Sequence, residues 1–175
     1  MSDVEIRMAS VYDAPRLLEI YAYYVEHTAI SFEYDVPTLQ EFQQRIARVL
    51  ERHPYLVAEL DGEILGYAYA SPLIDRAAYN WSAEVTIYLD KNARGKGIGP
   101  KLYAALEDAL KAGGIRNLYA CIGVPTEGEA DDAYINRNSQ NFHAHMGYHL
   151  VGTFQKCGFK GGRTLDMVYM EKFLS

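Results

Sequence analysis

The chain has 175 residues, 49% of them hydrophobic and 23% charged, and its formal net charge is −6 at neutral pH. This length suffices for one domain with a hydrophobic core, and the acidic balance argues against a general nucleic-acid-binding protein, which would carry a basic face. No apolar run approaches the ~20 residues of a membrane span, and the N-terminal residues lack the basic start and apolar core of a signal peptide. We therefore expect a single domain over residues 1–175, located in the cytoplasm, with no nucleic-acid or membrane partner.

The N-terminal half is expected to contain two helices between strands. Thr38 and Glu41 have the spacing of a capping box, and Pro54 ends the helix that follows near His53. Asp61-Gly62 lies between two strand-like segments and is a strong β-hairpin signal. In chain order the pattern predicts a strand at residues 4–8, a helix with Asp13 as its N-cap, a helix that begins after Thr38, and strands at 55–60 and 63–70.

The C-terminal half alternates strands with helices. Gly113-Gly114 and Gly147 are expected to end two helices, because glycine readily adopts the left-handed conformation that follows many helices. The predicted elements are strands at 83–89, 118–122, 150–155 and 164–172, and helices at 100–112 and 139–146. The resulting order, β-α-α-β-β-β-α-β-α-β-β, indicates an α+β or α/β domain with three layers and a mixed sheet.

The segment from residue 84 to residue 100 is the most informative part of the chain. It alternates apolar and polar residues like a strand, and then holds three glycines between Arg94 and Gly99, where backbone N–H groups can approach a ligand closely. Pro100 suits the first turn of a helix. A glycine-rich turn that leads into a helix N-terminus favours phosphate binding, and Arg94 can add a charge-assisted contact. The alternative is an ordinary glycine-rich connection.

The glycine spacing separates this loop from two well-known phosphate-binding motifs. Gly95-x-Gly97-x-Gly99 does not match the dinucleotide fingerprint G-x-G-x-x-G, and no Lys-Ser or Lys-Thr follows as in a Walker A loop. The motif R-x-x-G-x-G, carried by Arg94, Gly97 and Gly99, instead resembles the pyrophosphate loop of the GNAT superfamily of acetyl-CoA-dependent N-acetyltransferases. The order of elements also matches that fold, which implies an α+β, three-layer α/β/α domain with a mostly antiparallel sheet flanked by about four helices.

Further segments resemble one branch of this superfamily, the phosphinothricin acetyltransferases, which also includes methionine sulfone and sulfoximine acetyltransferases. The resemblance implies acetyl transfer from acetyl-CoA to the amine of a small amino-acid-like substrate, by direct attack in a ternary complex and without a metal. It also implies a homodimer. The matching segments are Ser31-Phe32-Glu33, His53–Ala58, Gly66–Ala70, Arg76-x-x-Tyr79-x-Trp81-x-x-Glu84, Arg94–Gly99 and Phe142-His143 with Gly147-Tyr148.

The resemblance implies roles for individual positions. The loop at residues 125–134 is longer and more acidic than in the branch, so Asn136 and Asn138 both remain candidates for one cofactor contact. The implied cofactor-binding residues are Ile87, Tyr88, Leu89, Arg94, Gly95, Lys96, Gly97, Ile98, Gly99, Asn136, Asn138 and Ser139. The implied substrate-binding residues are Phe32, Glu33, Arg76, Tyr79 and Thr86, and the implied catalytic residues are Glu84 and His143.

Glu84 falls where the branch has its proposed general base. Acetyl transfer needs a neutral amine, whereas an α-amino group with a pKa of about 7.7–8.0 is mostly protonated at neutral pH. Glu84 could accept that proton directly or through water, although the ordinary glutamate pKa of about 4.3 is low for this task, so partial burial or a relay is expected. The alternative is that Glu84 only binds the substrate ammonium group.

His143 is the candidate acid that would protonate the departing thiolate of coenzyme A. The alternative is a helix histidine that packs beneath the cofactor. His145 and His149 lie nearby, but no carboxylate or cysteine has ligand spacing with them, and neither Cys121 nor Cys157 has the spacing of a metal ligand. We therefore expect no metal.

A substrate carboxylate would need a cationic partner. Arg76, Lys160 and Arg163 are the candidates, and Arg76 is favoured by its place in the matching segment, although each could be an ordinary surface charge. Two other functions stay open. One is acetylation of polyamines or peptide N-termini, which the acidic loop at 126–132 would suit, and the other is a non-catalytic acyl-CoA-binding module.

Overall fold

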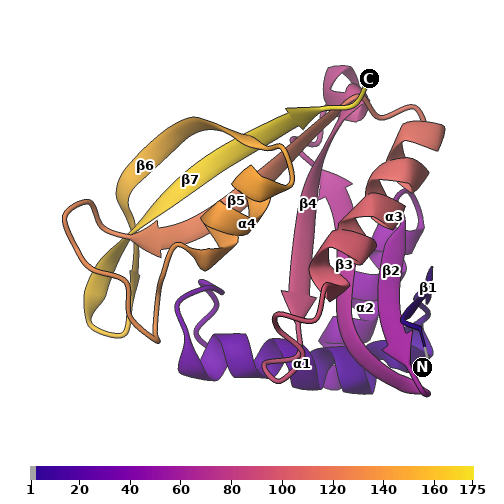
Figure 1. Cartoon of the computed structure of the whole chain (residues 1–175), viewed down its shortest axis with the longest axis horizontal. Coiled ribbons are helices and arrows are strands. Elements are labelled where there is room, and N and C mark those ends of the chain that lie inside the picture. The colour runs from indigo at the N-terminus through magenta and orange to yellow at the C-terminus, as the bar shows by residue number, and fades with distance from the viewer. Residues whose placement is uncertain (1–2) are drawn as a thin grey trace.

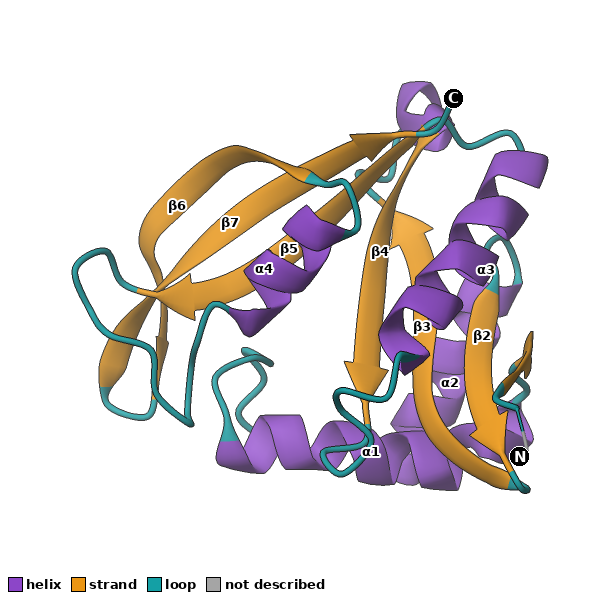
Figure 2. Ribbon diagram, viewed as in Figure 1, coloured by secondary structure: helices purple, strands orange, loops and turns teal. Residues whose placement is uncertain are grey.

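The structure is a computed structural model that describes residues 3–175 (Figures 1 and 2). Within these residues lie four α-helices, two short 3₁₀ helices and seven strands. None of the helices in this described part is long and apolar enough to cross a membrane. The elements are β1 (Glu5–Met8), η1 (Val11–Asp13), α1 (Ala14–His27), α2 (Leu39–Leu50), β2 (Tyr55–Leu60), β3 (Glu63–Pro72), η2 (Ala77–Trp81), β4 (Ser82–Leu89), α3 (Ile98–Ala112), β5 (Asn117–Pro125), α4 (Asn138–His145), β6 (His149–Lys160) and β7 (Arg163–Phe173).

The strands form one sheet in the order β1-β2-β3-β4-β5-β7-β6, and every neighbouring pair is antiparallel except β4 and β5. The parallel pair is short, because only Ser82–Glu84 of β4 pairs with Asn117–Tyr119 of β5. Beyond Glu84 the two strands diverge, and Figure 1 shows them close together near the C-terminus of the chain and far apart at their other ends. The sheet therefore opens into a wedge at its centre.

Strand alternation gives the sheet two different faces. Along β3, Ala68 and Ala70 pack against α3, whereas Tyr67 and Tyr69 point to the opposite face, where α1 and α2 lie. The small alanines let α3 pack closely on the sheet, and the tyrosines fill the wider space beneath α1 and α2. This arrangement confirms the predicted three-layer α+β fold with a mixed, mostly antiparallel sheet.

The N-terminal caps of α2 and α1 were both predicted, but only the α2 cap makes the expected side-chain bond. Thr38 caps α2 as predicted, accepting from the Glu41 N–H at 3.2 Å while the Glu41 carboxylate accepts from the Thr38 N–H at 2.8 Å. Asp13 occupies the N-cap position of α1, but its side chain makes no bond to that helix. It accepts instead from the Ser10 N–H at 2.8 Å, because Ser10 begins the unpredicted helix η1. Asp13 is thus the N-cap residue that the sequence predicts, and its side chain bonds to the start of η1.

The C-terminal strands β5, β6 and β7 are longer than predicted, and β6 is irregular. Its register shifts between Phe154 and Gly158, where Lys156 has a positive φ of 51°. The buried Asp166 carboxylate fixes this bulge, since it accepts from the backbone N–H of Lys156 at 2.7 Å and of Glu127 at 3.2 Å. Glycine and polar residues within the segment break its alternation, which is why the sequence indicated a shorter strand.

Candidate active site

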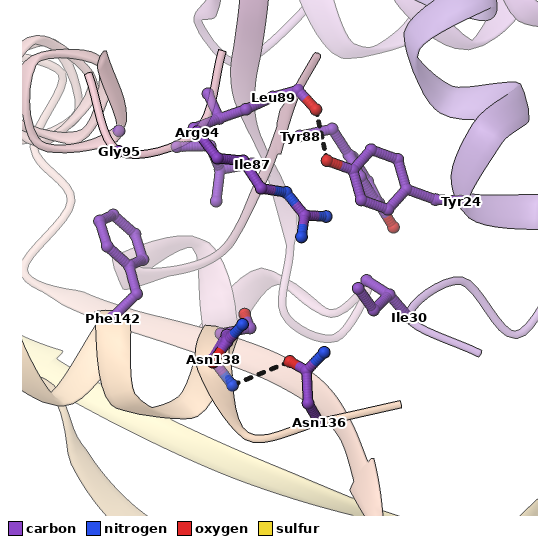
Figure 3. Close-up of a pocket in the computed structure, with 12 residues that line it drawn as sticks. Tyr24, Ile30, Ile87, Tyr88, Leu89, Arg94, Gly95, Asn136, Asn138 and Phe142 are labelled. Atoms are coloured by element: carbon purple, nitrogen blue, oxygen red, sulfur yellow. Dashed lines mark hydrogen bonds between the residues drawn. The ribbon is translucent and has the colours of Figure 1, made fainter. Parts of the chain in front are cut away.

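A cavity of about 320 Å³ lies where β4 departs from β5 (Figure 3). Among the described residues, the β5-facing side of β4 has no strand partner after Glu84, so backbone groups along this edge face the wedge. All of the predicted cofactor-binding residues line this cavity except Lys96, Gly97 and Ile98. The lining residues are Tyr24, Ile30, Ile87, Tyr88, Leu89, Arg94, Gly95, Gly99, Asn136, Asn138, Ser139 and Phe142.

The loop that joins β4 to α3 (Figure 2) turns through two glycines in the left-handed region. Gly95 and Gly97 have φ values of 75° and 74°, which other residues adopt only with strain. Gly97 is the N-cap of α3 and offers no side-chain cap, so the first backbone N–H groups of the helix remain available to an anion. The Ile98 side chain is buried in the core, and Lys96 is exposed outside the cavity, so both can contribute only through the loop backbone or by charge.

Arg94 supplies the positive charge of this cavity. Its guanidinium group points into the cavity, as Figure 3 shows. It lies 5.3 Å from the centroid of the Tyr24 ring. The Tyr24 hydroxyl in turn donates to the Leu89 carbonyl. Within residues 3–175 Arg94 forms no salt bridge, so its charge is not neutralised by a neighbouring carboxylate.

Gly99 is required by packing as well as by any ligand. A Cβ atom at this position would lie 3.1 Å from the Phe142 ring, which is tighter than ordinary contact. Gly99 therefore allows α4 to approach the start of α3 and to close one side of the cavity. The sequence motif predicted a glycine of functional importance at this position. The structure adds a packing contact with Phe142, 43 residues later in the chain.

The structure separates the two asparagine candidates. The Asn136 side-chain oxygen accepts from the Asn138 backbone N–H at 3.0 Å (Figure 3), and its amide nitrogen donates to the Asp132 carbonyl at 3.3 Å. Asn136 therefore shapes the turn before α4. The Asn138 side chain lines the cavity and makes no hydrogen bond to the described part of the chain, so it is the freer of the two.

His143 is buried, and both of its ring nitrogens are occupied. Nδ1 lies 2.7 Å from the Ser139 carbonyl, which can only accept, so Nδ1 carries the proton. Nε2 is 2.7 Å from the Tyr103 hydroxyl and must then accept from it. Burial lowers the pKa of His143, which favours the neutral imidazole.

A second cavity, of about 610 Å³, lies on the other side of β4. Of the predicted site residues it brings together Phe32, Glu33, Glu84 and Thr86. Arg76 and Tyr79 do not line it, because they lie at the exposed helix η2 before β4. The remaining lining residues are Tyr21, Ile30, Ser31, Tyr69, Tyr88, Cys121, Gly123, Phe154, Cys157 and Met167.

Glu84 lies at the last paired position of β4, directly before the strands diverge. Its side chain is half-buried, and burial raises the pKa of this carboxyl above the ordinary value of 4.5. No hydrogen bond joins the carboxylate to another of the residues 3–175. Glu33 contrasts with it, because the Arg45 guanidinium at 2.5 and 3.0 Å and the Tyr21 hydroxyl at 2.7 Å lower the pKa of Glu33.

A narrow cavity of about 50 Å³ connects the two larger ones at the point of divergence. It shares Ile87 and Ser139 with the first cavity and Thr86 and Cys121 with the second. Cys121 lies in an apolar strand and belongs to no motif, so its sequence context predicts no functional role. Only the divergence of β4 from β5 reveals its position in this passage.

Two further cations that were candidates for a substrate carboxylate have structural partners. The Lys160 ammonium group is buried and donates to the carbonyls of Val25 and Ser31, each at 2.8 Å. Arg163 pairs with Asp132 at 2.7 Å and with Glu129 at 3.8 Å. Neither side chain lines the cavity that contains Glu84, so the interpretation of these two as substrate-binding cations is not supported.

The acidic loop that follows β5 is partly neutralised within the chain. Besides the Arg163 pairs, Asp131 forms an ion pair with Arg137. The loop therefore presents less free negative charge than its sequence indicated. Among the described residues no group of three or more His, Cys, Asp or Glu side chains could hold a metal ion.

Comparisons with known proteins agree with this geometry. A family model for the acetyltransferase (GNAT) domain matches residues 6–169. A phosphinothricin N-acetyltransferase from Alcaligenes faecalis is 36% identical, over 97% of this chain and 82% of that protein. An L-methionine sulfoximine/L-methionine sulfone acetyltransferase from Pseudomonas paraeruginosa is 32% identical, over 95% of this chain and 92% of the relative.

A solved structure gives the same result. The phosphinothricin acetyltransferase of Sinorhizobium meliloti, crystallised in complex with AcCoA, superposes with a TM-score of 0.87 at 34% identity, over 98% of this chain and 88% of that one. The predicted enzyme class and the predicted use of acetyl-CoA are thus confirmed. The chain belongs to the GNAT acetyltransferase family and is an acetyl-CoA-dependent N-acetyltransferase.

Proposed function

We propose that this enzyme acetylates the amine of a small amino-acid-like molecule. We also propose that residues 1–175 act as one domain. The enzyme would work in the cytoplasm, where its two free cysteines would stay reduced. The observation that carries the proposal is the position of Glu84 in the acceptor cavity, at the last paired residue before β4 leaves β5 and borders the cofactor cavity. The names of the relatives support the substrate class. The polyamine alternative is weakened, because Glu129, Asp131 and Asp132 of the acidic loop pair with two arginines of the chain.

The cofactor would extend along the open edge of β4. Backbone groups of residues 87–89 would pair with the pantetheine arm in the way that an added strand pairs with a sheet. The loop from Gly95 to Gly99 and the start of α3 would hold the diphosphate, with Arg94 as its charged contact. Asn138 and Ser139 would contact the arm from the opposite side of the cavity.

The reaction needs one proton acceptor at the amine. In the proposed mechanism Glu84 takes a proton from the substrate ammonium group, directly or through water, and the neutral nitrogen attacks the thioester carbonyl. The C–N bond forms first and gives a tetrahedral intermediate. The nitrogen then loses its second proton to solvent, the C–S bond breaks, and coenzyme A leaves as its thiolate. A β4 backbone N–H beyond Glu84 would donate to the oxyanion.

For His143 the geometry favours the packing role over the acid role. A neutral imidazole that donates to the Ser139 carbonyl and accepts from Tyr103 has no free proton for a thiolate. We infer that the pair holds α4 against α3 and so fixes the wall of the cofactor cavity. The thiolate of coenzyme A would then take its proton from water.

Arg94→Gln is expected to weaken acetyl-CoA binding. Loss of one charge-assisted contact should raise the KM for acetyl-CoA by about tenfold and reduce its dependence on salt. Steady-state kinetics at two salt concentrations measures both. Lys111→Gln, at the far end of α3, is the matched control for net charge and should behave like wild type. Equal effects of the two substitutions would contradict the assignment of Arg94.

We further propose a homodimer in which the exposed face of β6 contacts a second copy. This strand is at the edge of the sheet, and its Leu150, Val151 and Phe159 side chains are each more than half exposed. An unpaired, apolar edge strand of this length is normally covered. The resemblance to the phosphinothricin acetyltransferase branch also implies pairing.

Light scattering should therefore give twice the chain mass of 19.8 kDa. Val151→Glu should shift the protein toward the monomer, because it places a charge in an apolar contact. Ala47→Glu, at an exposed position of α2, serves as a control charge on another surface. A wild-type protein that stays monomeric at all concentrations would refute the dimer.

Thiol release from acetyl-CoA across a panel of amines tests the proposed function. The panel should contain phosphinothricin, methionine sulfone, methionine sulfoximine, common amino acids, polyamines and short peptides. Turnover with the amino-acid-like group supports the proposal. Turnover confined to polyamines or peptides would show that the proposed substrate class is wrong. No turnover with any amine, together with tight binding of acetyl-CoA, would indicate a non-catalytic binding module.

A further inference from the structure

A fourth cavity, of about 280 Å³, adjoins the acceptor cavity on the face of the sheet that α1 and α2 cover. The two cavities share Tyr21, Glu33, Tyr69 and Tyr88, so a molecule that lies beside Glu84 could extend into the fourth one. We call it the tyrosine cavity. Its other lining residues are Phe42, Arg45, Arg48, Val49, Tyr55, Tyr67 and Ser71.

The tyrosine cavity contains hydroxyl groups that no protein group uses. Tyr55 and Tyr67 are 2% and 1% exposed, and their rings stack at 5.7 Å. Neither hydroxyl is hydrogen-bonded to another of the residues 3–175, and the one fully buried side-chain polar atom without a partner in this range is Nε of Arg163. The two hydroxyls therefore open onto the cavity. Burial raises the pKa of both well above the ordinary value, so they stay protonated and can donate.

The cavity also carries a net positive charge. Arg45 and Arg48 reach it from α2, and Glu33 is the carboxylate on its wall. Glu33 pairs with Arg45 through two contacts, at 2.5 and 3.0 Å. Arg48 forms no salt bridge within the described part of the chain, so one guanidinium charge remains for a ligand.

We infer that the tyrosine cavity binds the side chain of the acceptor and selects one that ends in an anionic, oxygen-rich group such as a carboxylate or a phosphinate. Tyrosine O–H donors and an unpaired guanidinium group match such oxygens. Arg48 is exposed, so a neutral side chain leaves its guanidinium group to water, whereas an anionic one gains a charge-assisted contact. The inference rests on the proposed function, because it requires the acceptor amine to lie at Glu84.

Matched pairs of acceptors provide the test. Glutamate against glutamine, and phosphinothricin against methionine sulfone, each compare an anionic with a neutral side chain of similar reach. We expect wild type to favour the anionic member in kcat/KM, and Arg48→Gln to reduce that preference by about tenfold, the value of one charge-assisted contact. Tyr67→Phe, which removes one hydroxyl and keeps the ring, should reduce the preference less. The KM for acetyl-CoA should not change in either variant.

Arg52→Gln is the control, since it removes a like charge just after the same helix and Arg52 lines none of the four cavities described. An equal preference in wild type and Arg48→Gln would overturn the inference while turnover of the neutral acceptors upholds the proposed function. If no amine turns over, the rise in Tm caused by glutamate and by glutamine in the presence of coenzyme A decides. A larger rise with glutamate that is lost in Arg48→Gln supports the cavity assignment, and equal rises refute it.

Discussion

Glu84→Gln is expected to lower kcat/KM for the acceptor by about 100-fold at neutral pH, because a positioned general base typically contributes 10²–10⁴-fold. Glutamine keeps the size of the side chain and loses the ability to accept a proton. Acetyl-CoA binding should be unaffected, since Glu84 does not line the cofactor cavity. Stopped-time thiol-release assays and a binding titration with acetyl-CoA measure the two quantities separately.

The pH profile distinguishes a base from a binding group. If Glu84 is the base, the loss of kcat/KM caused by Glu84→Gln should become smaller as pH rises. At high pH more of the substrate amine is already neutral, so it needs no proton acceptor. In wild type the acid limb of kcat/KM should lie above the ordinary glutamate range, since burial raises the pKa of Glu84. Glu63→Gln, an exposed glutamate in the β2–β3 hairpin, is the control. A defect of equal size in rate and in acetyl-CoA binding would contradict the base role.

The same raised pKa makes a prediction about stability. A carboxyl whose pKa is higher in the folded than in the unfolded state binds more protons when folded, so its contribution to stability falls as pH rises through that interval. Above the folded pKa the ionised Glu84 is therefore destabilising. Glu84→Gln should raise the Tm relative to wild type at pH 8 and give little difference below the unfolded pKa of Glu84. Such a gain with loss of activity is the pattern expected of a group kept for chemistry.

The sequence predicts most of this fold, because its signals are local. The capping box of Thr38, the Asp61-Gly62 hairpin and the glycines after two helices all act within a few residues. The predicted strands were shorter than β5, β6 and β7 are in the structure. The length of the β6–β7 pair is set by contacts between the two strands, which local sequence does not reveal. Helix η2 was missed, since its short 3₁₀ turn carries no capping bond.

For the candidate site too, local motifs could be predicted from the sequence, whereas contacts between distant segments could not. The loop from Arg94 to Gly99 follows from a motif and lies at the cofactor cavity. The pairing of Lys160 with two carbonyls and of Arg163 with the acidic loop could not be read from the sequence, because each joins segments far apart in the chain. For the same reason, the sequence does not predict the tyrosine cavity. Tyrosines that alternate along strands are typical of ordinary core packing.

Phe32 shows how distant glycines can shape the acceptor cavity. Its ring is 39% exposed and lies against β5 and β6, where a Cβ atom at Gly123 would come within 2.6 Å of the ring and one at Gly158 within 2.7 Å. The two glycines thus form a slot for the ring at the edge of the acceptor cavity. Because Phe32 is only partly buried, it can move when the slot is filled, and the cost should appear in substrate binding more than in folding.

Gly158→Ala is therefore expected to lower kcat/KM for the acceptor by about tenfold to 100-fold, since a displacement of about 1 Å in a positioning group can cost 10²-fold. The KM for acetyl-CoA should not change. Gly152→Ala in the same strand is the matched control, because a Cβ atom there meets nothing within 4 Å. In a Phe32→Leu background the smaller side chain relieves the clash, so Gly158→Ala should then have little further effect, a non-additivity expected only of residues in contact. Equal kinetics of the two glycine variants, or strict additivity with Phe32→Leu, would show that the slot does not position the acceptor.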